Sequence, residues 1–173
     1  SEIPAKSVYD GQGRYLIPGY IDTHMHVEST MMIPENLSRA ILPWGTTTIC
    51  TDDVHAKDLL TVGHINKVVR KAVQVGISGC EAIKLATFNA AREYGFDDLG
   101  AVAPGYIADM QIVDTLDGCQ PAAVFVEGRL VAENGAYTGP DHKEGDYDFP
   151  NTVNIPQIHS ADDFRLKAPT ADD

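Results

Sequence analysis

The chain has few cysteines and few basic residues. Its 173 residues include 3 cysteines, 13 lysines and arginines, and 25 aspartates and glutamates, for a net charge of −12. Cys50, Cys80 and Cys119 are widely spaced and form no CxxC pair, so we expect buried thiols rather than a disulfide framework or a thiolate zinc site. Because the excess acidic charge repels phosphate and anionic lipid, we expect neither nucleic acid nor membrane as a partner.

Long apolar runs are also missing. None approaches the roughly 18 residues of a membrane-spanning helix, and the N-terminal residues lack the basic and then apolar layout of a signal peptide. We therefore expect a cytoplasmic protein. The first residue is Ser1, so we expect the chain to begin inside a longer reading frame. A complete eight-fold β/α barrel needs about 250 residues, which is more than this chain has.

The residue pattern predicts a mixture of strands and helices. Apolar residues at helical spacing predict helices, whereas β-branched or alternating runs between Gly and Pro predict strands. Expected strands cover parts of 7–17 on either side of a turn at 10–13, then 20–27, 46–50, 108–113, 123–126 and 129–131, the last two forming a hairpin; expected helices cover 34–42, 57–75 and 80–94. Residues 141–173 are rich in acidic residues and predict an extended tail.

The strongest local signal is the DTHMH segment. Alternation along a strand places Asp22, His24 and His26 on one face. Two histidines at i and i+2 have Cα atoms about 6.6 Å apart, so both imidazoles can reach one divalent metal. The alternative is a pair of solvated strand histidines. The position of the pair after an apolar strand favours metal binding.

Carboxylates follow the strand ends. Asp52 and Asp53 come directly after the predicted strand 46–50, where an aspartate can bind metal and accept a proton from water. The alternative is that Thr51 or an aspartate caps the next helix. Glu28 follows the histidine pair and could orient the ligands, whereas the alternative is that Ser29 or Thr30 in the same segment only turns the chain.

The other histidines carry weaker signals. We expect His55 in a loop and His64 in a helix beside Gly63, each with a surface or core role. His142 and His159 lie in the polar tail, where we expect them to be solvated.

Several segments together resemble one family. The segments IPGYIDTHMHVESTMM and ILPWGTTTI resemble the first barrel strand and the following segment of adenine deaminases, in the amidohydrolase superfamily. The segments CTDDVHAKDLLTVGHINKVVRKAV, ATFNAAREYGFDDLGAVAPGYIADMQIVD and VFVEGRLVAENG resemble the eighth-strand region and the C-terminal part of the same family. The closing tract with NTVN and HSADDFRLKAP is also similar.

The resemblance implies a metal-dependent hydrolase that converts adenine and water to hypoxanthine and ammonia in adenine catabolism. Its α/β fold would comprise the first and last strands of a TIM-like (β/α)8 barrel, plus a small β-sandwich from flanking segments. The implied division is 1–18 and 101–140 in the sandwich, 19–50 at the first barrel strand, 51–100 at the eighth strand and its helices, and 141–173 as the acidic tail.

The resemblance also implies a two-metal centre with manganese or iron. By position, His24 and His26 match metal ligands of the first strand, and Asp52 matches the eighth-strand aspartate that binds metal and transfers protons. Asp53 is its less certain neighbour and a candidate for substrate binding. The family's second to seventh strands are missing between Ile49 and Thr51, together with further ligands and a catalytic glutamate.

Three interpretations follow. In the first, the chain is part of a complete adenine deaminase that acts on a purine base, and the missing strands lie elsewhere in the same protein or in a companion chain. We expect either a homo-oligomer or such a companion chain. Alternatively, the chain is a non-catalytic metal-binding or structural fragment. The third possibility is another cyclic amidine or amide hydrolase of the superfamily. The VES-MM and TDD-H contexts favour the first.

Overall fold

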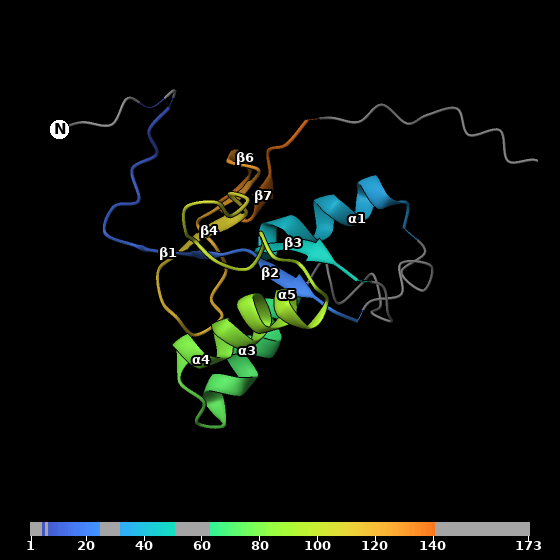
Figure 1. The fold of residues 1–173 in the computed structure, drawn as a ribbon. Coiled ribbons are helices and arrows are strands. Elements are labelled where there is room, and N and C mark those ends of the chain that lie inside the picture. Colours follow the sequence, from blue (N-terminus) through green and yellow to red (C-terminus); the bar gives the residue numbers. More distant parts are fainter. Residues whose placement is uncertain (1–4, 6, 25–31, 51–62, 141–173) are drawn as a thin grey trace, which may run out of the picture. The chain divides into compact units, whose positions relative to one another are not determined.

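The computed structural model describes residues 5, 7–24, 32–50 and 63–140 and shows a mixed α/β fold (Figure 1). Its strands and helices are listed here in chain order: β1 (Tyr15–Pro18), β2 (Tyr20–Asp22), α1 (Pro34–Ile41), a 3₁₀ turn η2 (Leu42–Trp44), β3 (Thr46–Ile49), α3 (Ile65–Gln74), α4 (Gly79–Lys84), a π-helical turn η3 (Leu85–Asn89), α5 (Ala90–Glu93), β4 (Met110–Val113), β5 (Ala123–Val126), β6 (Arg129–Glu133) and β7 (Ala136–Tyr137). None of these helices is long and apolar enough to cross a membrane.

Five strands form an antiparallel sheet in the order β1-β4-β5-β6-β7. Strand β1 pairs with β4, with Tyr15 opposite Val113, so the sheet joins two segments that are far apart in the sequence. The predicted hairpin at β5 and β6 is confirmed. Glu127 and Gly128 have φ angles of 49° and 73°, the left-handed conformation that two-residue hairpin turns favour. The β-sandwich stays a prediction, because the described strands of these two segments form one sheet.

Strands β2 and β3 form a separate parallel pair, in which Asp22 lies opposite Ile49 (Figure 1). Helix α1 lies between them in the sequence, and Pro34 at its first turn has the backbone angle that suits a helix start. The helix buries Leu37, Ala40 and Ile41. Parallel strands connected through a helix are the repeating unit of α/β folds. Closure into a barrel stays a prediction.

Several expected boundaries are wrong. The strand expected at 20–27 ends at Asp22, and residues 7–9 form no strand. Helix α3 begins at Ile65, so the expectation that His64 lies inside a helix is wrong. Gly63 has φ of 114°, outside the helical range, and Oδ1 of Asn66 accepts the His64 N–H at 2.8 Å, which stabilises a turn before the helix. The helix expected at 80–94 is observed over 79–93, with a π-helical turn at its centre.

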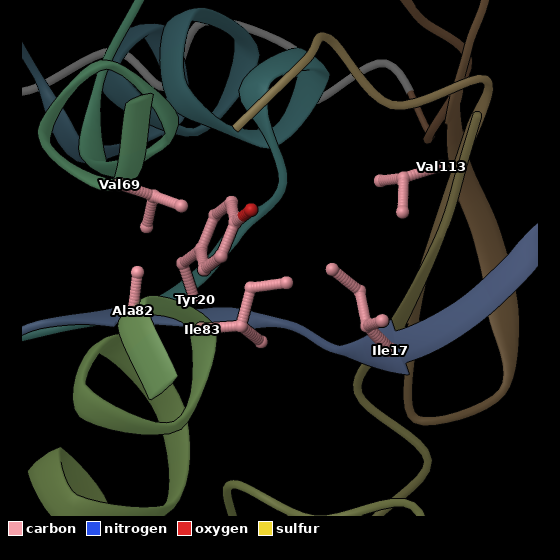
Figure 2. Close-up of a cluster of buried hydrophobic side chains, with 6 residues drawn as sticks. All are labelled: Ile17, Tyr20, Val69, Ala82, Ile83 and Val113. Carbon is pink, nitrogen blue, oxygen red and sulfur yellow. The ribbon is translucent and has the colours of Figure 1, made fainter. Parts of the chain in front are cut away.

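A buried cluster connects the antiparallel sheet to the helices. Figure 2 shows the Tyr20 ring among Val69, Ala82 and Ile83. Tyr20 is 1% exposed, and Ile17 and Val113 belong to the same cluster. The core therefore holds β2 against α3 and α4, which fixes the strand from which the candidate ligands emerge.

The cysteines are not buried thiols, contrary to the sequence-based prediction. All three are free; Cys80 is exposed, and Cys50 and Cys119 are partly buried. Ala82 and Ile83, rather than Cys80, form the buried face of α4.

Candidate functional site

The carboxyl ends of β2 and β3 lie side by side. The Cys50 N–H donates to the Asp22 carbonyl at 2.6 Å, just beyond the last paired residues. His24 follows Asp22 by two residues, is exposed, and donates its backbone N–H to Oδ1 of Asp22 at 3.0 Å. In α/β enzymes, the catalytic side chains follow the carboxyl ends of the parallel strands.

A buried polar cluster is formed by Asp22, Thr46 and His64. His64 Nε2 lies 2.7 Å from Asp22 Oδ2, and Nδ1 lies 2.8 Å from Thr46 Oγ1. The residues are 5%, 0% and 5% exposed, respectively. The contact with Asp22 is at ion-pair distance, although the ring N–H is not aligned with the carboxylate as in a hydrogen bond. Polar groups this deeply buried need such partners.

Two further contacts shape the edge. The Tyr94 hydroxyl donates to the backbone carbonyl of Thr23 at 2.7 Å, which links the end of α5 to the residue before His24. Burial, and secondarily the nearby Asp22 carboxylate, raises the pKa of the Cys50 thiol. The thiol therefore has less thiolate character than a free cysteine at the same pH.

Of the candidate site residues, the structure describes only His24. His26, Glu28, Asp52 and Asp53 fall in the ranges 25–31 and 51–62, which the structure does not describe, as does His55. His142, His159 and the predicted acidic tail lie beyond residue 140, where the description ends. Within the described ranges, no three His, Cys, Asp or Glu side chains form a metal-binding group.

The sequence analysis did not identify the cluster of Asp22, Thr46 and His64. Asp22 was predicted to share a face with the histidine pair, yet it is buried and its carboxylate is engaged by His64 and the His24 backbone. For His64, the core role is the one observed. The signal available in the sequence was Asp22, a polar residue at the end of an apolar strand. A polar side chain that is buried at such a position needs a partner from elsewhere in the chain.

Comparisons with known proteins gave matches to a family model, to curated sequences and to solved structures. The amidohydrolase family model matches residues 46–131. Curated adenine deaminases are 40% identical over 119 residues in Kosmotoga olearia (66% of this chain, 20% of the relative), 51% over 85 residues in Petrotoga mobilis (49% and 15%), and 38% over 128 residues in Desulfitobacterium hafniense (74% and 22%). A solved D-aminoacylase has a TM-score of 0.43 at 25% identity, covering 63% of this chain and 27% of its own.

The chain spans about one fifth of the length of the curated relatives that it matches. The resemblance given by the HxH, VES-MM and TDD segments agrees with these matches. The amidohydrolase family model thus matches just under half of the chain, and the curated relatives that the chain matches are adenine deaminases.

Proposed function

We propose that this chain is part of an adenine deaminase, which hydrolyses adenine to hypoxanthine and ammonia. The observation that carries the proposal is the identity of 38–51% to curated adenine deaminases. Because the chain spans about a fifth of those relatives, the reaction is proposed for the complete assembly. We further propose that the parallel pair β2 and β3 belongs to a TIM-like barrel, that the antiparallel sheet belongs to a small β-sandwich, and that the enzyme is cytoplasmic.

The candidate ligands fit a divalent metal by their chemistry. His24 and His26 offer imidazole nitrogens and Asp52 offers carboxylate oxygens, a set that suits manganese or iron. The structure supports a shared location, because His24 follows Asp22, Asp52 follows Cys50, and Asp22 and Cys50 are hydrogen-bonded to each other. Asp22 is not a fourth ligand in this proposal, because its carboxylate already contacts the His64 imidazole and accepts the backbone N–H of His24.

The residues divide the work of deamination. A bound divalent metal would supply Lewis-acid chemistry at this edge. The Asp52 carboxylate accepts the proton of the attacking water and returns it to the departing amino nitrogen, so that water adds to the purine carbon and ammonia leaves. Asp53 contacts the purine base, and Glu28 orients the histidine ligands. The roles of Asp52 and Asp53 follow from the family resemblance, and that of Glu28 from its position just after the histidine pair.

The missing partner is proposed to be a companion chain that carries the remaining barrel strands; a homo-oligomer is the alternative assembly, although it would not add those strands. Two parallel strands rarely stand alone, because such sheets are normally covered on both faces. An apolar groove of about 230 Å³ lies beside β2, lined by Ile21 together with side chains of α3, α4, η3 and α5. Val68 and Leu85 in this groove are 59% and 54% exposed, consistent with a surface that another segment covers.

The test is ammonia release from adenine with Mn²⁺ or Fe²⁺ by the complete assembly isolated from its host. We expect turnover, and we expect the double variant H24A/H26A to lose both turnover and metal content. D114N, which alters an exposed carboxylate in the loop after β4, is the control and should retain both. Turnover of a cyclic amide instead of adenine would support the sister-hydrolase alternative.

A second candidate function rests on the length of the chain. If the native protein has an intact mass near 18.7 kDa and no companion chain, a non-catalytic metal-binding or structural role is favoured. A heavier chain, or a second one that copurifies in stoichiometric amount and restores ammonia release, would contradict that role.

A further inference from the structure

We propose that His64 is a positioning residue that fixes the backbone of His24 by holding the Asp22 carboxylate. This inference rests on the proposed function for its catalytic meaning, and its geometry stands independently. Asp22 is the connecting residue: Oδ2 faces His64 Nε2 at 2.7 Å, and Oδ1 accepts the His24 N–H at 3.0 Å. His64 therefore lies two contacts away from the histidine that we propose as a metal ligand.

His64 is itself held at its imidazole and at its backbone. Thr46 Oγ1 lies 2.8 Å from Nδ1, and Thr46 is fully buried in β3. The backbone N–H of His64 donates to Asn66 Oδ1 at 2.8 Å, and Asn66 is fully buried in the first turn of α3. A side chain with these restraints has few rotamers open to it, so it can restrain the carboxylate that it contacts.

The same carboxylate lies where the two strands end. The backbone carbonyl of Asp22 accepts the Cys50 N–H at 2.6 Å, so residue 22 contacts both strand ends. His64 comes from the start of α3, a third segment. Its contact with Asp22 thus ties the start of α3 to the edge from which His24 emerges, and a small movement of Asp22 would change the position of the His24 backbone.

A second tether reaches the same segment without Asp22. The Tyr94 hydroxyl donates to the Thr23 carbonyl at 2.7 Å. Removing this contact leaves Asp22 and His64 in place. Y94F therefore separates a general loosening of residues 23–24 from the specific effect of the Asp22 carboxylate.

The test uses the metal-free complete assembly first, with the amide of His24 as the reporter. We expect H64L to increase hydrogen exchange of the His24 amide about tenfold and to move its proton resonance upfield, because the hydrogen bond to the carboxylate weakens. V69A removes buried volume from the neighbouring core without touching Asp22, and it is the control for lost stability. Equal changes at His24 in H64L and V69A would overturn the proposal.

The second measurement is Mn²⁺ affinity of the complete assembly. We expect H64L to weaken Mn²⁺ binding about 10- to 100-fold, as for other residues that orient metal ligands, with partial recovery in H64Q, whose amide N–H can still face Asp22. If the wild-type assembly binds no Mn²⁺, the proposed function fails, whereas the exchange result at His24 still decides the positioning role. If H64L does not fold, H64Q and T46V replace it, and an unchanged His24 amide in both would overturn the proposal.

Discussion

Nε2 of Gln111 donates a hydrogen bond to the backbone carbonyl of Pro18 across 3.0 Å. It also reaches the Gly45 carbonyl at 3.5 Å, and Gln111 is fully buried in β4. Since Pro18 ends β1 and Gly45 precedes β3, one side chain of the antiparallel sheet secures the start of the parallel pair. The connection accounts for a buried amide in an otherwise apolar layer.

Replacement of Gly45 should expose how tightly Gln111 is packed. Gly45 has φ of 85°, and a Cβ there would lie 2.0 Å from Gln111 Oε1. We expect G45A to lower the free energy of unfolding by about 2–4 kcal/mol, from left-handed backbone strain and overpacking together. Gly95 has φ of 74° with no atom within 4 Å of such a Cβ, so G95A reports strain alone, about 1 kcal/mol. Urea denaturation compares the two, and equal losses would contradict the packing argument.

Alkaline pH should destabilise the fold through Tyr20. Burial, with smaller contributions from Cys119 and Asp117, raises the pKa of its phenol well above the ordinary value of 10.0. Below pH 10 the phenol is neutral in both states; above it, Tyr20 ionises only in the unfolded chain, so stability is lost as the pH rises. We expect the free energy of unfolding to fall less between pH 9 and 11 in Y20F than in wild type. The exposed Tyr15 supplies the control variant, Y15F, which should follow wild type.

Replacement of Asp109 by a neutral residue should be tolerated better at neutral than at acidic pH. Burial raises the pKa of its carboxyl, although the Glu127 N–H donates to Oδ1 at 2.9 Å and opposes the shift. Its stabilising contribution is fully present below the unfolded pKa of 3.8 and is lost as the pH rises through the folded pKa. Asparagine keeps the acceptor oxygen without the charge. We therefore expect the stability of D109N relative to wild type to be higher at pH 7 than at pH 3.5, measured by urea denaturation. A pH-independent difference would contradict this explanation.

Ser78 should control the titration of Glu81 at the start of α4. The Ser78 hydroxyl donates to Glu81 Oε2 at 2.6 Å and accepts the Glu81 N–H at 3.3 Å, a reciprocal capping arrangement. The hydrogen bond from the Ser78 hydroxyl, and secondarily one from the Ser78 backbone, lowers the pKa of the Glu81 carboxyl below 4.5. We expect S78A to raise the pKa of Glu81 toward that value in a carboxyl-carbon NMR titration. Glu93 is the internal reference in the same spectra, and an unchanged Glu81 curve would assign the lowered pKa to another cause.

Local sequence was sufficient to predict the elements with strong local signals. The β-branched run Thr46–Ile49 and the turn at Glu127 and Gly128 needed no distant partner to be identified. Helix α1 followed from Pro34 and the apolar spacing after it. These signals lie within a few residues, so reading the sequence in short windows captures them.

Long-range contacts could not be predicted in the same way. The burial of His64 depends on Asp22 and Thr46, which belong to two other segments, and nothing beside His64 in the sequence indicates either contact. The early end of β2 has a local cause instead, because the Asp22 carboxylate accepts the His24 N–H two residues further on, which favours a turn over a continued strand. The candidate ligand His24 could be identified from its spacing to His26, whereas the residues that hold it in place depend on the tertiary fold.

The pairing of β1 with β4 closes a loop of about 90 residues between Pro18 and Met110. The entropy of closing a loop grows only with the logarithm of its length, and each doubling costs about 0.6 kcal/mol. A segment inserted between β3 and α3 would therefore leave the register of this pairing unchanged at little cost. The pairing of β1 with β4 is therefore compatible with intervening segments of very different length. A change in the intervening sequence need not alter these two strands.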